Sequence, residues 1–488
     1  MSLELLDVNC LINAGRNIET PFRLRVSKPG CGASDIEFVR ILRLLPGKRI
    51  VALAKDQGRS VLVKTYLGRN AARNALREMS GIKLIEQAGV STAGLLWEAS
   101  LPGDGQLLAF EFLPNAIGLA EQLKKCEEQR TDILSSVMQI MSRLHSHGVI
   151  QKDIHLANFL LSLDEIYTID GGGIHSRTTE PLSEQPSIDN LALFFAQFLA
   201  RYDVLVPAVF SDYEEARGWG QDEGRLSGLQ KEIARHRGLR KQAYIDKAFR
   251  DCTRFVCRSS FRRYMVCERN EYSDEMQAVL ENPDKFIADG HSIKQGRTST
   301  VALVHLQDRS LIIKRYNIKG VAHGLQRAFR KSRAWVSWSN AFRMEFLDIP
   351  SLKPIALLED RIGPLRSKAY LITEYIEGPD ALQCLREMEK PNGELEALAN
   401  ILYKLSESQI SHGDLKATNF VMSNNGPVVI DLDAMREHKS HVTFAKAFKD
   451  DLERFMENWQ DSPTLASRFQ GLLSDLNDLY GTKDQRHR

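Results

Sequence analysis

The chain has 488 residues, 43% apolar and 26% charged, with a net charge of +2, which fits a globular protein of two domains of roughly 200–260 residues each. Seven scattered cysteines without CxxC pairs argue against a disulfide framework or a zinc site and favour a reducing compartment. The N-terminus does not resemble a signal peptide and no stretch approaches ~20 consecutive apolar residues, so we expect a cytoplasmic protein that spans no membrane.

The first half of the chain alternates β-type and helical segments. In chain order, the predicted elements are a β-hairpin at 49–68, a helix at 72–89, a strand at 107–114, a long helix at 131–148 and helical segments from 188 to about 265.

The second half repeats this order. A hairpin at 298–316 precedes a helical stretch that ends near Phe346, a strand at 369–378 and a helix at 395–408. The linker is expected within 272–286, where Asn282–Pro283 marks a break. We therefore expect a first domain at 1–268 and a second, shorter domain at 269–488.

One constellation of polar residues occurs twice with identical spacing. Asn follows Asp by five positions and a second Asp follows Asn by twelve; the sets are Asp153, Asn158 and Asp170, and Asp414, Asn419 and Asp431. In phosphoryl transfer one carboxylate accepts the proton of the acceptor hydroxyl, while an amide and a second carboxylate hold the magnesium of ATP. The repeat therefore predicts a duplicated kinase-like catalytic loop that uses ATP and Mg²⁺, with Asp153 and Asp414 as bases.

A lysine ends the second strand of each predicted hairpin. In a kinase, a lysine at this place reaches the α- and β-phosphates, and a glutamate on the next helix orients it. Lys64 and Lys314 are the candidate lysines, and Glu78 is the candidate glutamate of the first half.

The second half does not offer an equivalent glutamate. Aligning 89–94 with 348–353 places Ser337 opposite Glu78, and Glu345 lies about two helical turns further on. We therefore expect the second half to lack the lysine–glutamate pair and the first half to be the more active one.

Two further features have a functional and a plain structural interpretation. The turns at 45–50 and 294–300 place Lys48 and Arg297 where they could cradle phosphate, although each turn has a single glycine and the sequence favours an ordinary β-turn. An acid also follows the second Asp of each set by 19 or 20 positions; the candidates are Asp189, and Asp450 or Asp451. Such an acid would hydrogen-bond the catalytic loop, or simply cap a helix.

Basic residues concentrate in 225–269 and in 312–335, and the second of these segments contains no Asp or Glu. They predict a surface for a phosphate-rich partner, with solvated helix faces as the alternative. The residues in question are Arg235, Arg237, Arg240 and Lys241, and then Arg330, Lys331 and Arg333. No nucleic-acid motif is present, so nucleic acid is not an expected partner.

Several of these stretches resemble the lipopolysaccharide core sugar kinases of Gram-negative bacteria, the heptose/Kdo kinase family. LHSHGVIQKDIHLANFLL resembles the catalytic loop of that family, and LIIKRY with SRAWVSWSNAFRMEFLDIP resembles its lysine strand and following helix. Because the resemblance covers most of both halves, the chain is identified as a tandem member.

The resemblance implies an α+β fold of two tandem protein-kinase-like bilobal domains, each with a small β-rich N-lobe and a helical C-lobe. It implies ATP-dependent phosphorylation of a heptose or Kdo in a core glycolipid, with possible contact with the inner membrane face. The implied bases are Asp153 and Asp414; Asn158, Asp170, Asn419 and Asp431 would bind Mg²⁺; Lys64, Glu78 and Lys314 would bind the nucleotide. The chain departs from the family at Gln151–Lys152, at the two glycines after Asp170 and at Ser337.

Two other functions stay open on the sequence. One is a pseudokinase-type scaffold in which one or both halves are inactive, although retention of both Asp/Asn/Asp sets favours an enzyme. The other is a kinase of another small hydroxyl compound, such as an aminoglycoside or a choline-like alcohol, which HGDLKATN at 412–419 suggests. The basic segments favour an anionic substrate over a cationic one.

Overall fold

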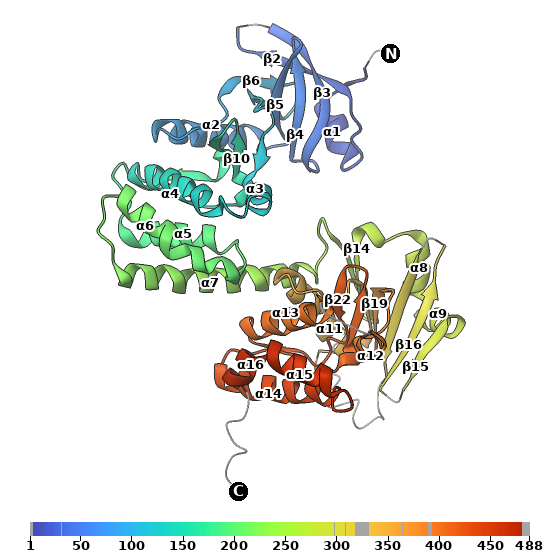
Figure 1. Cartoon of the computed structure of the whole chain (residues 1–488). Helices are drawn as coiled ribbons and strands as arrows, with labels where there is room; N and C mark the ends of the chain where they lie inside the picture. The colour runs from blue at the N-terminus through green and yellow to red at the C-terminus, as the bar shows by residue number, and fades with distance from the viewer. Residues whose placement is uncertain are drawn as a thin grey trace. The chain divides into compact units, whose positions relative to one another are not determined.

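The computed structural model describes residues 3–30, 32–296, 298–307, 309–317, 331–363, 365–388 and 393–480. They form two compact units, Met1–Gly238 and Leu239–Arg488, and each unit combines a sheet with a group of helices (Figure 1). Within the described residues, none of the helices has the combination of length and apolar character that crossing a bilayer requires.

The first unit contains a seven-stranded sheet in the order β1-β2-β3-β4-β5-β7-β6. Its strands are β1 (Leu5–Leu6), β2 (Phe22–Lys28), β3 (Gly32–Leu45), β4 (Arg49–Asp56), β5 (Arg59–Leu67), β6 (Leu95–Leu101) and β7 (Gly105–Glu111). A bridge between Ser27 and Ser100 joins β2 to β6, so the sheet closes on itself. Alternate residues of β2 are buried, as expected when one face of a strand covers a core. The predicted hairpin is β4 and β5, whereas β1 to β3 were not predicted.

Helices and short strands complete the first unit. The helices are α1 (Val8–Ala14), α2 (Ala71–Gln87), α3 (Leu119–Lys125), α4 (Arg130–Ser146), α5 (Glu184–Phe195), α6 (Val206–Ala216) and α7 (Glu223–Lys247). The short strands are β8 (Ile117–Gly118), β9 (Val149–Gln151), β10 (Phe159–Ser162), β11 (Glu165–Thr168) and β12 (Ile174–Ser176). Helix α4 buries Val137, Met138 and Met141 at helical spacing and packs against α6.

The second unit contains a seven-stranded sheet in the order β13-β14-β18-β19-β17-β16-β15. Its strands are β13 (Phe255–Ser259), β14 (Arg263–Glu268), β15 (His291–Gln295), β16 (Ser299–His305), β17 (Ser310–Tyr316), β18 (Pro354–Ile362) and β19 (Leu365–Glu374). The short strands are β20 (Ile410–Ser411), β21 (Phe420–Ser423), β22 (Gly426–Val429) and β23 (Arg436–Glu437).

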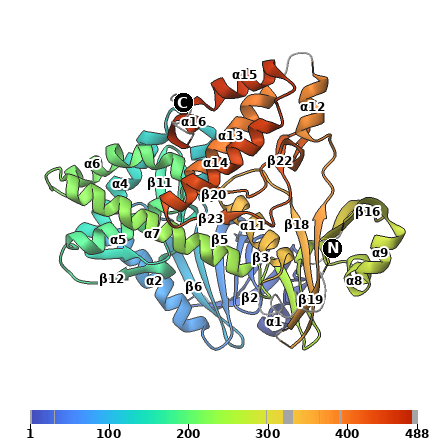
Figure 2. The ribbon, with the colours of Figure 1, turned by 90° about the horizontal axis from the view of Figure 1, so that it is seen from below.

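The helices of the second unit are α8 (Asp274–Glu281), α9 (Pro283–Asp289), α11 (Arg333–Phe346), α12 (Ala381–Glu387), α13 (Gly393–Glu407), α14 (His441–Glu457), α15 (Pro463–Leu472) and α16 (Ser474–Tyr480). Helix α11 begins where the hydroxyl of Ser332 accepts the N–H of Trp335. Helices α13, α14, α15 and α16 lie together in Figure 2, over a core that includes Leu402, Phe444 and Phe455.

The two sheets repeat the same register around the predicted lysines. Lys64 on β5 pairs with Val51 of β4 and Leu108 of β7. Lys314 on β17 pairs with Val301 of β16 and Leu371 of β19. The positions of the two units can therefore be compared one by one.

The boundary between the units differs from the one predicted after residue 268. Strand β14 pairs with β18, so residues 255–268 belong to the sheet of the second unit. Phe255 and Val266 are buried there with Trp338 of α11. The boundary lies within α7, and Pro283, read as part of a break, starts helix α9.

Candidate active site

The lysine of the first unit forms the predicted ion pair with the helix glutamate. Lys64 Nζ lies 2.5 Å from Glu78 Oε1 and 3.4 Å from Asp170 Oδ1. Glu78 is almost completely buried on α2. Its carboxylate also accepts the backbone N–H groups of Gly171 and Gly172, at 3.0 and 2.9 Å. The structure thus brings together Lys64, Glu78 and Asp170 from three separate segments.

Asp170 follows β11 and has a left-handed backbone conformation, with φ of 70°. Few residues other than glycine adopt this conformation, and it is concentrated at functional sites. Burial raises the pKa of Asp170, but the charges of Lys64 and Arg49 together with hydrogen bonds to Lys64 and Glu78 hold the pKa below its ordinary value. The Arg49 guanidinium lies 3.8 Å from the carboxylate.

The second unit places its lysine and acid in the same relation. Lys314 Nζ lies 2.6 Å from Asp431 Oδ1, and Asp431 also has a left-handed conformation, with φ of 59°. Burial raises the pKa of Asp431, but the charge of Lys314, its hydrogen bond and a hydrogen bond with Asp433 together hold the pKa below its ordinary value. Both acids are therefore held charged beside a lysine.

The two Asp–Asn loops have the same internal hydrogen bonds. The amide nitrogen of Asn158 donates to the backbone carbonyl of Asp153 at 3.3 Å, and that of Asn419 donates to the carbonyl of Asp414 at 2.7 Å. Because each amide nitrogen is engaged within its loop, the amide oxygen is the atom suited to a cation. In each unit the backbone carbonyl of the asparagine also accepts the N–H of the residue before the second Asp, at 2.8 Å.

The helix acid that was predicted to hold the catalytic loop is present in the second unit. Asp451 on α14 accepts the N–H of His412 at 2.6 Å and that of Gly413 at 3.0 Å. In the first unit the prediction of Asp189 is wrong, because its carboxylate binds Gln185 on its own helix. The neighbouring Asn190 binds the loop instead.

Asn190 lies 20 positions after Asp170, as Asp451 does after Asp431. Its amide donates to the carbonyl of Gln151 at 2.8 Å and accepts the N–H of Gln151 at 3.4 Å. At this position the first unit has the amide of Asn190, where the second unit has the carboxylate of Asp451. A prediction that considered only acids therefore chose the neighbouring Asp189.

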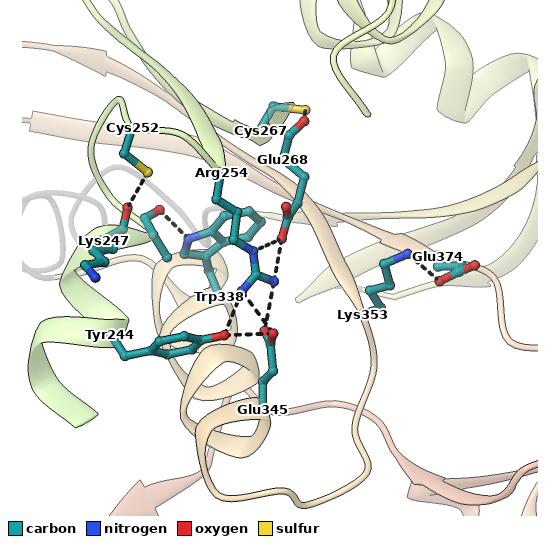
Figure 3. A network of polar contacts seen from close by, with 11 residues as sticks. Tyr244, Lys247, Cys252, Arg254, Cys267, Glu268, Trp338, Glu345, Lys353 and Glu374 are labelled. Atoms are coloured by element: carbon teal, nitrogen blue, oxygen red, sulfur yellow. Dashed lines mark hydrogen bonds and ion pairs between the residues drawn. The ribbon is translucent and has the colours of Figure 1, made fainter. Parts of the chain in front are cut away.

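Glu345 does not serve as the partner of Lys314. Its carboxylate accepts from Tyr244 at 2.8 Å and from Arg254 at 2.9 Å, in a network that also includes Glu268 (Figure 3). Ser337 occupies the place of Glu78, and its hydroxyl lies 3.1 Å from Tyr316 OH, as Glu78 lies 3.2 Å from Tyr66 OH.

The residue that sequence reasoning missed is Asp433. Its carboxylate lies 3.3 Å from Lys314 Nζ, and its side chain is 4% exposed. A signal was available, because Asp433 stands where the first half has Gly172, two positions after the repeated Asp.

A pocket adjoins each lysine and acid pair, and the two pockets differ in chemistry. The pocket of the second unit, about 420 Å³, is lined largely by apolar side chains together with Lys314, Asn419 and Asp431; the apolar residues include Val301, Ile312, Leu371, Val421 and Ile430. The pocket of the first unit, about 630 Å³, is lined by Arg43, Lys48, Arg49, Arg77, Glu78, Asp153, His155, Asn158 and Asp170, among others. Lys48 lines this pocket, whereas Arg297 lies outside the described residues.

The basic residues predicted to contact a phosphate-rich partner are largely engaged within the protein. Arg235, Arg237 and Lys241 form ion pairs with acidic neighbours, and burial lowers the pKa of Arg240. In the other predicted cluster, Arg333 pairs with Asp433 at 2.7 Å, while Arg330 lies outside the described residues. Four of these cations are therefore paired with acids of the protein itself.

Comparison with known proteins agrees with this geometry in the second half of the chain. Residues 278–471 match the model of the lipopolysaccharide kinase (Kdo/WaaP) family, and this region includes Lys314, Asp414, Asn419 and Asp431. No curated protein matches the chain. Among solved structures, WaaP in complex with acyl carrier protein aligns with 40% of this chain and 88% of its own, at 21% identity and a TM-score of 0.31. Residues 278–471 therefore resemble the lipopolysaccharide kinase (Kdo/WaaP) family, a family of kinases that act on lipopolysaccharide.

Proposed function

We propose that this protein is an ATP- and Mg²⁺-dependent kinase that phosphorylates a heptose or a Kdo of the lipopolysaccharide inner core. It would act in the cytoplasm, with the glycolipid acceptor presented at the inner membrane face. We also propose that each unit is a protein-kinase-like bilobal domain. The repeated register around Lys64 and Lys314 supports this tandem arrangement.

The observation that carries the proposal is the pocket of the second unit. Apolar side chains such as Val301 and Val421 offer a surface for a flat nucleobase, and Lys314, Asn419 and Asp431 lie at the same pocket. A pocket with a mainly apolar lining and a few convergent polar groups is typical of a cofactor site.

The donor set of the second unit fits Mg²⁺-ATP. Asn419 and Asp431 supply an amide and a carboxylate oxygen, and Mg²⁺ prefers such oxygens while keeping phosphate and water ligands. When bound, ATP supplies the phosphoryl group and Mg²⁺ neutralises its charge. Lys314 adds a fixed positive charge at the site of transfer.

Asp414 is the proposed base, and it would accept the proton of the sugar hydroxyl. Its side chain is 44% exposed, so an acceptor can approach it. Lys416 Nζ lies 3.0 Å from Asp414 Oδ1 and Arg454 lies 3.9 Å from it. These cations place positive charge where the transferred phosphoryl group would pass, which stabilises a transition state of this kind.

The first unit receives the same assignments residue by residue. Asp153 would be its base, Asn158 and Asp170 would hold the metal ion, and Lys64, oriented by Glu78, would bind the phosphates. Its pocket lining is richer in cations and poorer in apolar side chains than that of the second unit. We therefore propose the second unit as the main kinase site, which reverses the order expected from the sequence.

Phosphate transfer from ATP to purified core oligosaccharide, followed by mass spectrometry of the product, tests this function. We expect wild type to add phosphate to a heptose or Kdo, Asp414→Asn to lower the rate by about 100-fold or more, and Asp153→Asn to lower it less. Asp461→Asn is the matched control, because that side chain is 90% exposed. Wild-type protein that adds no phosphate to any core acceptor would contradict the proposal.

A further inference from the structure

The two units hold their lysines with carboxylates that come from different places in the chain. In the first unit Glu78 reaches Lys64 from helix α2, and the loop after Asp170 has only glycines beside it. In the second unit Ser337 is too short to reach Lys314, and Asp433 approaches it from the loop after Asp431.

The glycine in the first unit leaves the space that the glutamate occupies. A Cβ atom at Gly172 would lie 3.1 Å from Glu78 Oε2, and a Cβ atom at Gly171 would lie 2.4 Å from the backbone oxygen of Glu78. A side chain at either position would therefore displace the helix or its carboxylate. A side chain at 172 would therefore crowd the carboxylate of Glu78, and the glycine leaves that space free.

The contact between the helix and the loop after the repeated Asp also differs between the two units. A Cβ atom at Gly81 of α2 would lie 1.9 Å from the oxygen of Gly171, so helix and loop backbones touch in the first unit. The corresponding position of α11 is Asn340, whose amide donates to the oxygen of Leu432 at 2.8 Å. A side chain bridges the gap in the second unit, and this wider gap accommodates the loop side chains.

The charge at the two sites stays balanced despite these exchanges. The first site combines two cations with two carboxylates, which are Lys64, Arg49, Glu78 and Asp170. The second site does the same with Lys314, Arg333, Asp431 and Asp433. Because a buried charge without a partner is costly, the two cations of the second site are balanced by two carboxylates, and Asp433 supplies the one that the helix lacks.

We infer that Asp433 is the positioning residue for Lys314 and takes in the second unit the role of Glu78 in the first. This inference rests on the proposed function, because the purpose of holding Lys314 is to keep its ammonium at the phosphates of the nucleotide. Asp433 then compensates for the serine at position 337, so the second site has a carboxylate that positions its lysine.

Two substitutions in the full-length protein, made singly and together, test this inference. Asp433→Gly introduces the residue of the first unit, Ser337→Glu introduces its helix carboxylate, and the double variant rebuilds the first-unit arrangement around Lys314. Two quantities are measured: kcat and KM for ATP with core oligosaccharide, and the rate at which an acetylating reagent modifies the Lys314 amine in the absence of nucleotide. Thermal melting checks the fold, and Asp461→Gly is the control for loss of an exposed acid.

Asp433→Gly is expected to lower kcat by about 100-fold with a much smaller change in KM, and to speed acetylation of Lys314. The double variant should recover at least about tenfold of that kcat and slow the acetylation again, because a glutamate at 337 reaches the lysine as Glu78 does. A residue that only supports the fold would not be rescued from a helix position.

The outcomes separate the inference from the proposed function. If wild type transfers no phosphate, the function fails, while the acetylation rates still decide the role of Asp433. If Asp433→Gly does not fold, Asp433→Asn, which keeps the side-chain shape, is measured in its place. Unchanged kcat and acetylation in the single variant, or no recovery in the double variant, would overturn the inference. Arg333→Met should leave acetylation of Lys314 near the wild-type rate; if it reproduces the effect of Asp433→Gly, the inference is also overturned.

Discussion

Asp451 accepts the backbone N–H of Gly413 through both carboxylate oxygens, at 3.0 and 3.1 Å. Gly413 directly precedes Asp414, so a helix residue fixes the loop that carries the proposed base. Burial raises the pKa of Asp451, and the donated amides offset part of that effect. The hydrogen bonds that the carboxylate accepts therefore stabilise it in its buried position.

We predict that Asp451→Ala lowers both stability and turnover. It would leave the buried N–H groups of His412 and Gly413 without partners, at a cost of about 1–3 kcal/mol in unfolding free energy. Urea unfolding and kcat for phosphate transfer measure the two effects. Asp450→Ala is the matched control, since Asp450 is exposed on the same helix. Equal effects of the two variants would contradict the assigned role.

The corresponding contact in the first unit predicts a dependence of stability on pH. His145 is buried, and burial lowers its pKa to about 4, while a hydrogen bond to Asn190 opposes and the charge of Arg217 adds to this shift. Its Nε2 lies 3.1 Å from Asn190 Oδ1 and its Nδ1 lies 2.8 Å from Tyr213 OH. Because Asn190 Oδ1 can only accept, the neutral imidazole carries its proton on Nε2.

The lowered pKa of His145 determines the direction in which stability changes with pH. Between about pH 6.5 and pH 4 the unfolded chain binds a proton that the folded chain does not, so stability falls as the pH falls through this window, by up to about 3 kcal/mol. Unfolding by urea at a series of pH values should show this slope for wild type and a flatter one for His145→Gln. His147→Gln, at an exposed neighbouring position, should keep the wild-type slope. A wild-type slope in His145→Gln would refute the assignment.

The apolar part of the second pocket predicts an effect confined to nucleotide binding. Val421→Trp should fill the space beside Ile430 and weaken ATP binding at least about tenfold, or about 1.4 kcal/mol. Titration with a fluorescent ATP analogue measures the affinity. Val442→Trp is the control, because Val442 is 78% exposed on α14. Unchanged affinity in Val421→Trp would mean that the base binds elsewhere.

Sequence reasoning succeeded where one residue has a fixed place in a repeated pattern. The spacing of Asp, Asn and Asp, with a lysine at the end of a strand, was enough to predict that Lys64 approaches Asp170 and that Lys314 approaches Asp431, and the structure confirms both contacts. The register of strands and loops is locally encoded, so it can be read from sequence spacing.

The errors arose where the same contact is made in the two units by residues from different parts of the chain. Ser337 indicated a missing carboxylate, but Asp433, which lies 3.3 Å from Lys314, compensates from a separate segment. The exchange becomes visible only when helix α11 and the loop are placed together. The helix-to-loop contact in the first unit was missed for a related reason, because an amide takes the place of the carboxylate. Asn190 accepts the N–H of Gln151 and donates to its carbonyl, whereas Asp451 accepts the N–H groups of His412 and Gly413.

The lysine and acid pair is repeated in both units, and it predicts a dependence on metal that differs between variants of the first and of the second unit. Asp431→Asn should weaken Mg²⁺-dependent nucleotide binding to the second unit at least about tenfold, because an amide is a weaker magnesium ligand than a carboxylate. Asp170→Asn should leave that binding unchanged, since Asp170 belongs to the first unit. The affinity is measured by calorimetric titration with ATP in the presence of Mg²⁺ and of EDTA.

Two features of the structure sharpen this experiment. Asp431→Asn also deprives Lys314 of a charged partner at 2.6 Å, so melting temperatures must be compared, and Asp433 should limit the loss because it remains beside the lysine. Asp461→Asn provides the exposed control. If Asp431→Asn binds nucleotide with unchanged affinity in Mg²⁺, or if the wild-type affinity is the same in EDTA, the carboxylate is not a metal ligand and the assignment of Asp431 must be abandoned.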